Sequence, residues 1–569
     1  MRITTGDSPE KAAADPARDS SSIHARVEWI VAALQRPPSV THHAIFACTA
    51  ALIAVACFYT GVVPTRQYAS DLTSFADCGW RILQGLRPSV DFSTGLGSFV
   101  FIMWAAALKL GGGTVTGFGY VDAIVALTAG IWGYVVLTRR AGGILAVTGA
   151  LMIVLLGVAP NAPGESFRLS THAMHYNRWG FALLAVLIAE SLPIRSAREA
   201  RSFGGGLSSG ILVGVLLFLK PNFGGAALAV SAASLLWNGR WERRRFCGLL
   251  AGASAAVLPF LFFIHFQVGR LIADLRMAAD ARSGAVSPAW VAEVFTTNLP
   301  AFLIVAALAI CSQSATPAES GSGWQGYLLR FRSVLLAIAV FGMGCLLMVT
   351  NSQQDRLPLN EILVLLFLDS ILRGRLRHDV RLASSLVLIA CGLILGWVGS
   401  DFLALMNGVR LKHSLPNQAS NPLAHRVNVG GFAPLWLLDD YNQDSLMANH
   451  GAFVAAYLSD GAALLRREMK PGEIVATFDT YNALAYAVAA RPARGGMAFA
   501  WYKYHFSDRL HPAPETYFGD AGIVMYPKTP DVPQAGFNGL LKYYGAELER
   551  QFIPVAESAR WKLYRRRTH

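Results

Sequence analysis

Charged side chains are scarce in this sequence. Asp, Glu, Lys and Arg make up 15% of the 569 residues, whereas 53% are hydrophobic, and the mean hydropathy is +0.40. A soluble multidomain protein of this length would carry a larger share of charged residues. The composition therefore excludes a soluble chain and predicts a polytopic α-helical membrane protein.

Cysteines are also few, and they form no recognisable pattern. The chain has seven, and all except Cys78 lie inside apolar segments. The spacing shows neither a CxxC pair nor the regular intervals of a disulfide framework. This excludes a fold that depends on disulfides and a zinc site built from cysteines.

Acidic residues are outnumbered by basic ones, 36 to 49, which gives a net charge of +13. Much of the excess lies in Arg clusters of short loops between apolar segments, such as Arg139–Arg140 and Arg243–Arg245. Clusters of this kind mark the cytoplasmic side of membrane proteins. No basic face or nucleic-acid-binding motif accompanies the charge, so we expect no nucleic-acid partner.

Eleven apolar segments approach the length of a membrane span. Residues 1–42 precede them without an apolar run long enough to bury, which predicts a disordered cytoplasmic tail. The segments define a membrane domain over residues 43–406. They cover residues 44–63, 116–138, 144–160, 179–192, 203–219, 223–237, 246–266, 295–311, 333–350, 357–372 and 382–406.

A twelfth apolar run, Phe99–Leu110, is short for a membrane span. If it crossed the membrane, every later Arg cluster would face the outside. If it lies at the outer surface, all the Arg-rich loops face the cytoplasm, as the positive-inside rule requires. We therefore predict a juxtamembrane or re-entrant helix here, with loop 64–115 and everything after Met406 on the extracytoplasmic side.

Residues 407–569 have the composition of a soluble domain. The sequence predicts a helix over 452–469, strands over 474–478, 522–528 and 561–567, and a further helical stretch after the first strand. Such alternation is typical of an α/β domain. Asp479 follows the first strand, where α/β domains often contact a ligand, although a turn residue is the commoner role.

The early outer loop is unusually rich in acids, namely Asp71, Asp77 and Asp91. Later outer loops add polar and basic groups. A carboxylate can deprotonate a hydroxyl while cations neutralise a leaving phosphate, so this set suits a lipid-phosphate substrate. We predict Asp71 as the catalytic residue and no metal ligands. The predicted substrate-binding residues are Asp91, His175, Tyr176, Arg178, Lys220, Gln354 and Arg356.

Most of these residues also have a structural interpretation. Asp71 can cap the helix that follows it, and Asp91 can cap a turn. His175 and Tyr176 suit the aromatic belt at a membrane surface, and Lys220 can extend from a helix end to the headgroups. For Asp77, the neighbouring pattern favours the solvated face of its helix over a substrate contact.

The stretch from Tyr68 to Leu110 resembles the polyprenyl-phosphate-dependent glycosyltransferases of the GT-C fold, close to bacterial lipid-sugar and arabinose transferases. Asp71 matches the acid that this family carries early in its first exported loop. GLRPSVD at 85–91 matches the segment that follows, with Ser89–Val90 in place of the usual aromatic residue. Phe99–Leu110 matches the juxtamembrane helix. Residue motifs match only around 68–112, whereas the architecture agrees over nearly the whole chain.

The resemblance implies an inverting membrane glycosyltransferase that moves a hexose or pentose from a polyprenyl-phosphate donor to a glycan or lipid acceptor. It implies Asp71 as the general base, with the active site and the C-terminal domain outside the bacterial inner membrane. Some relatives carry an acidic, metal-associated motif after the third span. Glu165 is the lone acid of the corresponding segment here, so we expect no required metal cofactor.

Two other functions stay open at this point. A polysaccharide ligase or polymerase also uses a lipid-linked donor, but it usually relies on Arg and His in a large late loop. A transporter would be expected to carry ionisable groups near mid-membrane and paired broken helices, neither of which is visible in the sequence.

Overall fold

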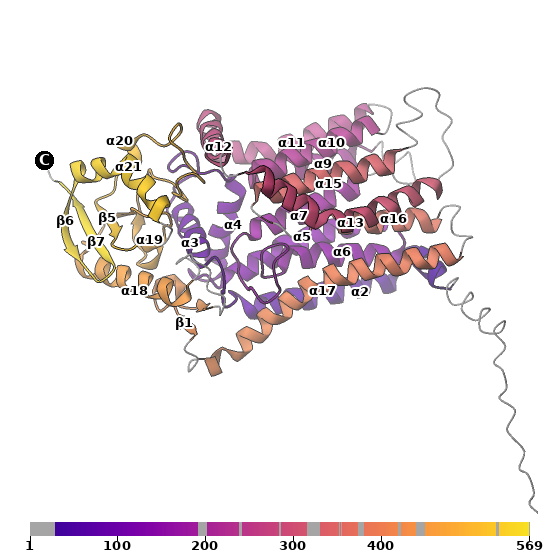
Figure 1. Cartoon of the computed structure of the whole chain (residues 1–569), viewed down its shortest axis with the longest axis horizontal. Helices are drawn as coiled ribbons and strands as arrows, with labels where there is room; N and C mark the ends of the chain where they lie inside the picture. The colour runs from indigo at the N-terminus through magenta and orange to yellow at the C-terminus, as the bar shows by residue number, and fades with distance from the viewer. Residues whose placement is uncertain are drawn as a thin grey trace, which may run out of the picture.

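The structure is a computed structural model that describes residues 29–191, 202–237, 242–283, 286–315, 331–351, 353, 356–373, 380–418, 423–439, 450–530 and 534–567. Figure 1 shows a long helix bundle with a smaller domain of strands and helices at one end. The predicted tail, residues 1–42, falls mostly outside the described residues. Residues 29–35 are helical, however, and the Gly143 amide donates to the Arg36 carbonyl (2.7 Å). Residues 29–42, the part of the predicted tail that the structure describes, are therefore ordered.

Each of the eleven predicted apolar segments corresponds to a helix of the bundle. These helices are α2 Val40–Thr60, α5 Gly117–Thr138, α6 Gly143–Val158, α7 His175–Ser191, α9 Phe203–Leu219, α10 Pro221–Trp237, α11 Arg243–Phe263, α13 Pro288–Ala315, α15 Arg332–Thr350, α16 Leu359–Arg373 and α17 Val380–Gln418. The prediction of a polytopic helical fold is confirmed.

Six of these helices are long and apolar enough to cross a membrane by length and composition. They are α2, α5, α11, α13, α15 and α17. The other five have 15–17 residues. Among these, α7 is buried along its entire length, and α16 is buried at nearly every position. Both are surrounded by other helices, so their short apolar stretches meet protein along most of their surface.

Glycines allow α9 and α11 to pack closely. A Cβ atom at Gly206 or Gly210 would lie 2.1 Å from a backbone carbonyl oxygen of α11, and one at Gly248 or Gly252 would lie 2.1–2.2 Å from a carbonyl oxygen of α9. Each helix therefore presents a small-xxx-small face to the other, the usual route to close helix contact in membranes. This contact fixes the end of α9, where Lys220 lies.

Three further helices lie at the end of the bundle that faces the C-terminal domain, namely α3 Ala69–Leu83, α4 Ser98–Leu110 and α12 Val268–Ser283 (Figure 1). The predicted short helix at 99–110 corresponds to α4, which has 13 residues. Its beginning is held at the end of α9 because the Gly97 amide donates to the Leu219 carbonyl (3.2 Å).

The C-terminal domain contains a five-stranded mixed sheet in the order β4-β3-β5-β7-β6. The strands are β3 Ile474–Thr477, β4 Arg491–Pro492, β5 Ile523–Pro527, β6 Phe552–Glu557 and β7 Trp561–Arg566, and the helices are α18 Gly451–Glu468, α19 Leu484–Ala487, α20 Pro514–Tyr517 and α21 Gln534–Gln551. β3 pairs in parallel with β4 and β5, whereas β7 is antiparallel to both its neighbours. The predicted α/β character, the three predicted strands and the predicted first helix are confirmed.

The connection between the bundle and this domain differs in detail from the sequence prediction. α17 continues past residue 407 to Gln418, so the predicted domain boundary falls inside a helix. Beyond it, the two-stranded sheet of β1 Ala424–Arg426 and β2 Trp436–Leu438 encloses the short helix η2 Gly430–Phe432. Thr65, directly after α2, exchanges backbone hydrogen bonds with Trp436 and Leu438 (2.8 Å each). The domain is thus attached directly to the loop between α2 and α3.

Candidate active site between the bundle and the C-terminal domain

α3 places Asp71 at the junction of the two parts of the molecule. The helix begins after Tyr68, which has a left-handed backbone (φ 54°) and is the N-cap, so Asp71 lies in the first turn and is not the capping residue. The Asp71 carboxylate accepts a hydrogen bond from Tyr481 of the C-terminal domain and faces Arg282 of α12. Burial raises the pKa of Asp71 to about 6, although Tyr481 and Arg282 act in the opposite direction.

Lys220 lies between α9 and α10, where it is held by neutral groups. Its Nζ atom is 2.5 Å from Oδ1 of Asn351 and 3.5 Å from Oδ1 of Asn177. It also lies 5.1 Å from the centre of the Tyr176 ring, within the range of a cation–π contact. Within the described part of the chain, no carboxylate forms an ion pair with Lys220.

Arg282 brings a second cation to the same region. Its Nη1 donates to the carbonyl of Thr350 at the end of α15 (2.7 Å), and its guanidinium lies 5.9 Å from the centre of the Tyr504 ring. Its charge acts on Asp71, Tyr176 and Lys220. Asp71 and two cations from different helices therefore gather around one tyrosine ring.

The C-terminal domain adds His505 to this group. The His505 ring stacks on Phe499 at 5.6 Å. Burial, together with the charges of Arg282 and Lys220, lowers the pKa of His505 to about 3, so this imidazole is neutral at pH 7. Its Nδ1 atom has no hydrogen-bond partner among the described residues.

Several amide groups beside Lys220 also have polar atoms without a partner in the described part of the chain. They are Nδ2 of Asn177, Nδ2 of Asn351 and both side-chain polar atoms of Gln353, all of them buried. Buried polar atoms normally have partners. A cation surrounded by unused amide donors suits the oxygens of a phosphate.

Aromatic rings connect Asp71 to its surroundings. Phe75, one turn after Asp71 on α3, lies 5.5 Å from Tyr176 and 5.0 Å from Phe499. Tyr481 in turn lies 6.3 Å from Phe499. The carboxylate is therefore bordered by apolar rings from the bundle and from the C-terminal domain, which explains why burial is the largest influence on its pKa.

Two predicted substrate-binding arginines lie elsewhere, in an ion network inside the bundle. Arg178 of α7 is 3.3 Å from Asp401 of α17, and Arg356 is 2.9 Å from Asp401 and 2.5 Å from Glu361 of α16. Arg178 also donates to the side chain and the carbonyl of Asn161. Two cations thus face two carboxylates, and the guanidinium groups are directed at protein partners.

The remaining acids between α2 and α4, Asp77 and Asp91, have structural contacts. Asp91 accepts from the Arg87 amide (2.8 Å) and lies 3.7 Å from Arg494 of the C-terminal domain. Asp77 is 1% exposed and pairs with Arg81 (3.0 Å), so the prediction that it lies on a solvated face is wrong. Asp77 is buried because the C-terminal domain covers that face of α3.

Gln354 lies outside the described residues. Asp479 is fully buried, accepts hydrogen bonds from Tyr457 and from the amide of Thr480, and thus belongs to the interior of the C-terminal domain. The predicted turn role agrees with this placement better than a ligand contact does.

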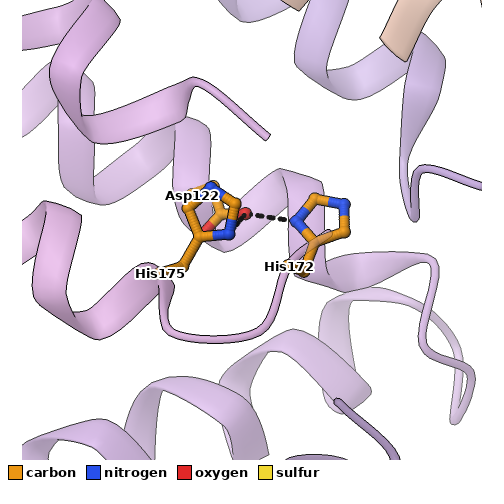
Figure 2. Close-up of side chains that lie close together, drawn as sticks. All are labelled: Asp122, His172 and His175. Carbon is orange, nitrogen blue, oxygen red and sulfur yellow. Dashed lines mark hydrogen bonds and ion pairs between the residues drawn. The ribbon is translucent and has the colours of Figure 1, made fainter. Parts of the chain in front are cut away.

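His175 belongs to a buried group with His172 and Asp122, the only set in the described ranges with the composition and spacing of a metal site. Figure 2 shows both imidazoles beside the Asp122 carboxylate. Nδ1 of His172 lies 2.7 Å and Nδ1 of His175 lies 3.6 Å from Oδ2 of Asp122. Trp179 donates to the other carboxylate oxygen (3.1 Å).

The hydrogen bonds of His172 do not fit a metal ligand. Its Nε2 accepts from the Val63 amide (3.0 Å), so its proton lies on Nδ1 and points at Asp122. A metal on Nδ1 would force that proton onto Nε2, against the Val63 N–H. A neutral histidine ligand usually donates from its other nitrogen, and His172 accepts there. The hydrogen bonds therefore fit a pair of Asp122 and His172. His175 is held through Nε2 at the Ala159 carbonyl (3.1 Å), and its Nδ1 has no hydrogen-bond partner among the described residues.

The sequence did not point to Arg282, Tyr481 or His505. Arg282 lies in a predicted outer loop, and Tyr481 follows a predicted strand. Each position is compatible with a site, but no motif around either residue indicates its chemical role. His505 had no signal. By contrast, Asp71, Tyr176 and Lys220 were predicted, and the structure brings them together.

Comparisons with known proteins give matches in structure alone. No protein-family model matches the sequence, and no curated protein matches it significantly. Among solved structures, ArnT from Cupriavidus metallidurans bound to undecaprenyl phosphate is similar over 92% of this chain and 98% of its own, with 13% identity and a TM-score of 0.42. ArnT in the apo state matches equally, over 97% of its own chain.

An oligosaccharyltransferase from Archaeoglobus fulgidus, in complex with Zn and sulfate, is similar over 89% of this chain and 71% of its own. Its identity is 11% and its TM-score 0.36. Likeness at this level leaves the function to be argued from the chain's own residues. Those residues form a junction where one carboxylate and two cations meet.

Proposed function

We propose that this chain is a membrane glycosyltransferase that moves a sugar from a polyprenyl-phosphate donor to a hydroxyl group of a glycan or lipid acceptor. The observation that carries the proposal is the gathering of Asp71, Lys220 and Arg282 around Tyr176 at the end of the bundle. A general base and two phosphate-neutralising cations are the groups that such a transfer requires.

In the proposed reaction, the acceptor oxygen attacks C1 of the donor sugar on the face opposite the phosphate. A C–O bond to the acceptor forms while the C–O bond to the phosphate breaks, and the phosphate leaves with the electron pair. Asp71 takes the proton of the acceptor hydroxyl. Because attack is from the opposite face, the configuration at C1 inverts.

The surroundings of Asp71 suit this role. A general base is most effective when its pKa is near the working pH, because it is then both deprotonated and strongly basic. The pKa of Asp71, raised to about 6 by burial, meets this condition better than that of an ordinary aspartate. Lys220 and Arg282 offset the charge that develops on the leaving phosphate, and the unused amides of Asn177 and Asn351 supply further donors.

The proposal places the site and the C-terminal domain on the extracytoplasmic face. Cysteines introduced at the exposed positions Lys109 and Arg509 should react with an impermeant thiol reagent added to intact cells, above the labelling of the parent chain. A cysteine at Arg139, at the opposite end of α5, should react only after the membrane is opened. Labelling at Arg139 in intact cells would reverse the proposed orientation.

The function is tested by comparing the glycolipids and surface glycans of a deletion strain with those of its parent by mass spectrometry. We expect an intact lipid-linked sugar to accumulate while one glycan or lipid substituent disappears. The wild-type gene should restore the substituent, and an Asp71→Asn gene expressed at equal level should not. Shortened polymer chains in place of a lost substituent would indicate a polymerase or ligase, and unchanged lipid-linked sugars would reject the donor class.

A further inference from the structure

The C-terminal domain is docked directly on α3, the helix that carries Asp71. Trp80 of α3 donates from Nε1 to the Ala490 carbonyl (2.8 Å), and the Tyr486 amide donates to Asp77 (3.3 Å). The Tyr486 hydroxyl donates to the Gly113 carbonyl (2.9 Å), just beyond α4. These contacts fix the orientation of α3 relative to the domain.

The same contact surface extends along α3 to Asp71. Phe499 of the domain packs on Phe75, and Tyr481 pairs with Phe499 in an antiparallel bridge. The Ala500 amide donates to the Thr480 carbonyl (2.9 Å), which holds the Tyr481 backbone against this segment. Tyr481 is 8% exposed, so its hydroxyl has little freedom to leave Asp71.

Two groups act on Asp71 from the elements packed around it. Tyr481 comes from the C-terminal domain and donates a hydrogen bond, and Arg282 comes from α12 and acts through its charge. The charge of Asp71 acts in turn on Tyr176 of α7, whose ring contacts Lys220, and the charges of Lys220 and Arg282 act on His505. Among the described residues, Tyr481 supplies the directional contact that selects one orientation of the carboxylate.

We propose that Tyr481 is a positioning residue that aims the Asp71 carboxylate at the acceptor hydroxyl, so that docking of the C-terminal domain completes the active site. The inference rests on the proposed function of Asp71 as the base. A hydrogen bond from Tyr481 to one carboxylate oxygen leaves the other oxygen for the acceptor proton. The soluble domain thereby contributes to catalysis from a residue distant in sequence from the outer loop.

The test is a Tyr481→Phe variant of the full chain, which keeps the ring packing on Phe499 and Trp501. Infrared difference spectra of purified protein, recorded across a pH titration, report the C=O stretch of protonated carboxyl groups. The band that Asp71→Asn removes identifies Asp71. Because a hydrogen bond to a charged group is lost, Tyr481→Phe should move the midpoint of this band upward by about one to two pH units.

Tyr486→Phe is the matched control, since it removes one hydroxyl contact of the same docked domain without touching Asp71. Its Asp71 midpoint should equal that of the wild type. A midpoint unchanged in Tyr481→Phe, or moved equally in both variants, overturns the inference. In transfer assays, the acidic limb of the pH–rate profile of Tyr481→Phe should move upward by the same amount as the band.

The two readouts separate this inference from the proposed function. If Asp71→Asn retains full transfer, the base assignment fails whatever the spectra show. If Asp71→Asn abolishes transfer but the Tyr481→Phe midpoint stays at the wild-type value, the positioning role fails and the function stands.

Discussion

Two groups of charges in this molecule, one inside the bundle and one at the half-buried junction with the C-terminal domain, differ in how they are paired. In the bundle, Arg178 and Arg356 face Glu361 and Asp401 at ion-pair distance. At the junction with the C-terminal domain, the carboxylate of Asp71 lies with two cations that are held by carbonyls, amides and rings. A buried charge needs a partner of opposite sign, because an unpaired one strongly destabilises the fold, whereas an excess of positive charge with unused donors suits an anionic ligand.

The largest expected effect concerns the junction. Asp71→Asn keeps the size of the side chain and removes the base, so sugar transfer by purified protein in nanodiscs should fall by about 10²–10⁴-fold. Asp508→Asn, at an exposed ion pair with Lys542 in the C-terminal domain, is the control for the loss of one aspartate charge. Transfer at the wild-type rate by a folded Asp71→Asn protein would remove Asp71 from the proposed mechanism.

The second prediction concerns the paired network. Asp401→Ala leaves two buried arginines with one carboxylate, which should destabilise the bundle by about 3–5 kcal/mol. Thermal unfolding in detergent measures the effect. The exposed ion pair between Lys528 and Glu557 provides the control, and Glu557→Ala should leave the unfolding temperature unchanged. An Asp401→Ala protein with wild-type stability and impaired donor binding would instead place the network in the substrate site.

The third prediction tests a single cation of the junction. Lys220→Ala removes one charge-assisted contact to the donor phosphate and should weaken donor use by about 1.5–3 kcal/mol. Lys220→Arg should recover part of the loss. Lys109→Ala, at the exposed end of α4, is the control for a change in surface charge. Transfer kinetics at varied donor concentration measure the effect, and full activity of Lys220→Ala would make Lys220 a membrane anchor only.

The bundle network and the junction could be predicted from the sequence to different extents, for physical reasons. Membrane spans and strands depend on local composition, so the eleven bundle helices and three of the strands could be predicted from the sequence. Asp71 was predicted because it lies in the only early loop rich in acids and matches the acid of the family that this stretch resembles. The pairing of Arg178 and Arg356 was not, because their partners come from helices distant in the chain. Both arginines were predicted to bind substrate from their charge and their position in loops at one membrane surface.

Tyr481 and Arg282 show the same limit at the junction. Each reaches Asp71 only through the docking of elements that are hundreds of residues away in the sequence. The missed elements β6 and α21 have local causes. β6 contains Pro554 and alternates poorly, and α21 contains Gly536, Gly539 and Gly545, which lower helix propensity.

The smallest expected effect is a pH dependence of stability at Asp71. Because burial raises the folded-state pKa of Asp71 to about 6, above its ordinary value, the folded protein binds the Asp71 proton more tightly than the unfolded chain does. This contribution to stability is fully present below the ordinary aspartate pKa, and it is lost as the pH rises through about 6. Ionised Asp71 therefore weakens the fold at pH 7, and Asp71→Asn should unfold at a higher temperature than the wild type.

The difference in unfolding temperature between Asp71→Asn and the wild type should shrink as the pH falls from 7 to 4, where both side chains are neutral. Thermal unfolding of both proteins across this range measures it, with Asp77→Asn as the control that should show no gain. A constant difference between wild type and Asp71→Asn at all pH values would mean that Asp71 is not the buried, proton-binding group on which the comparison depends.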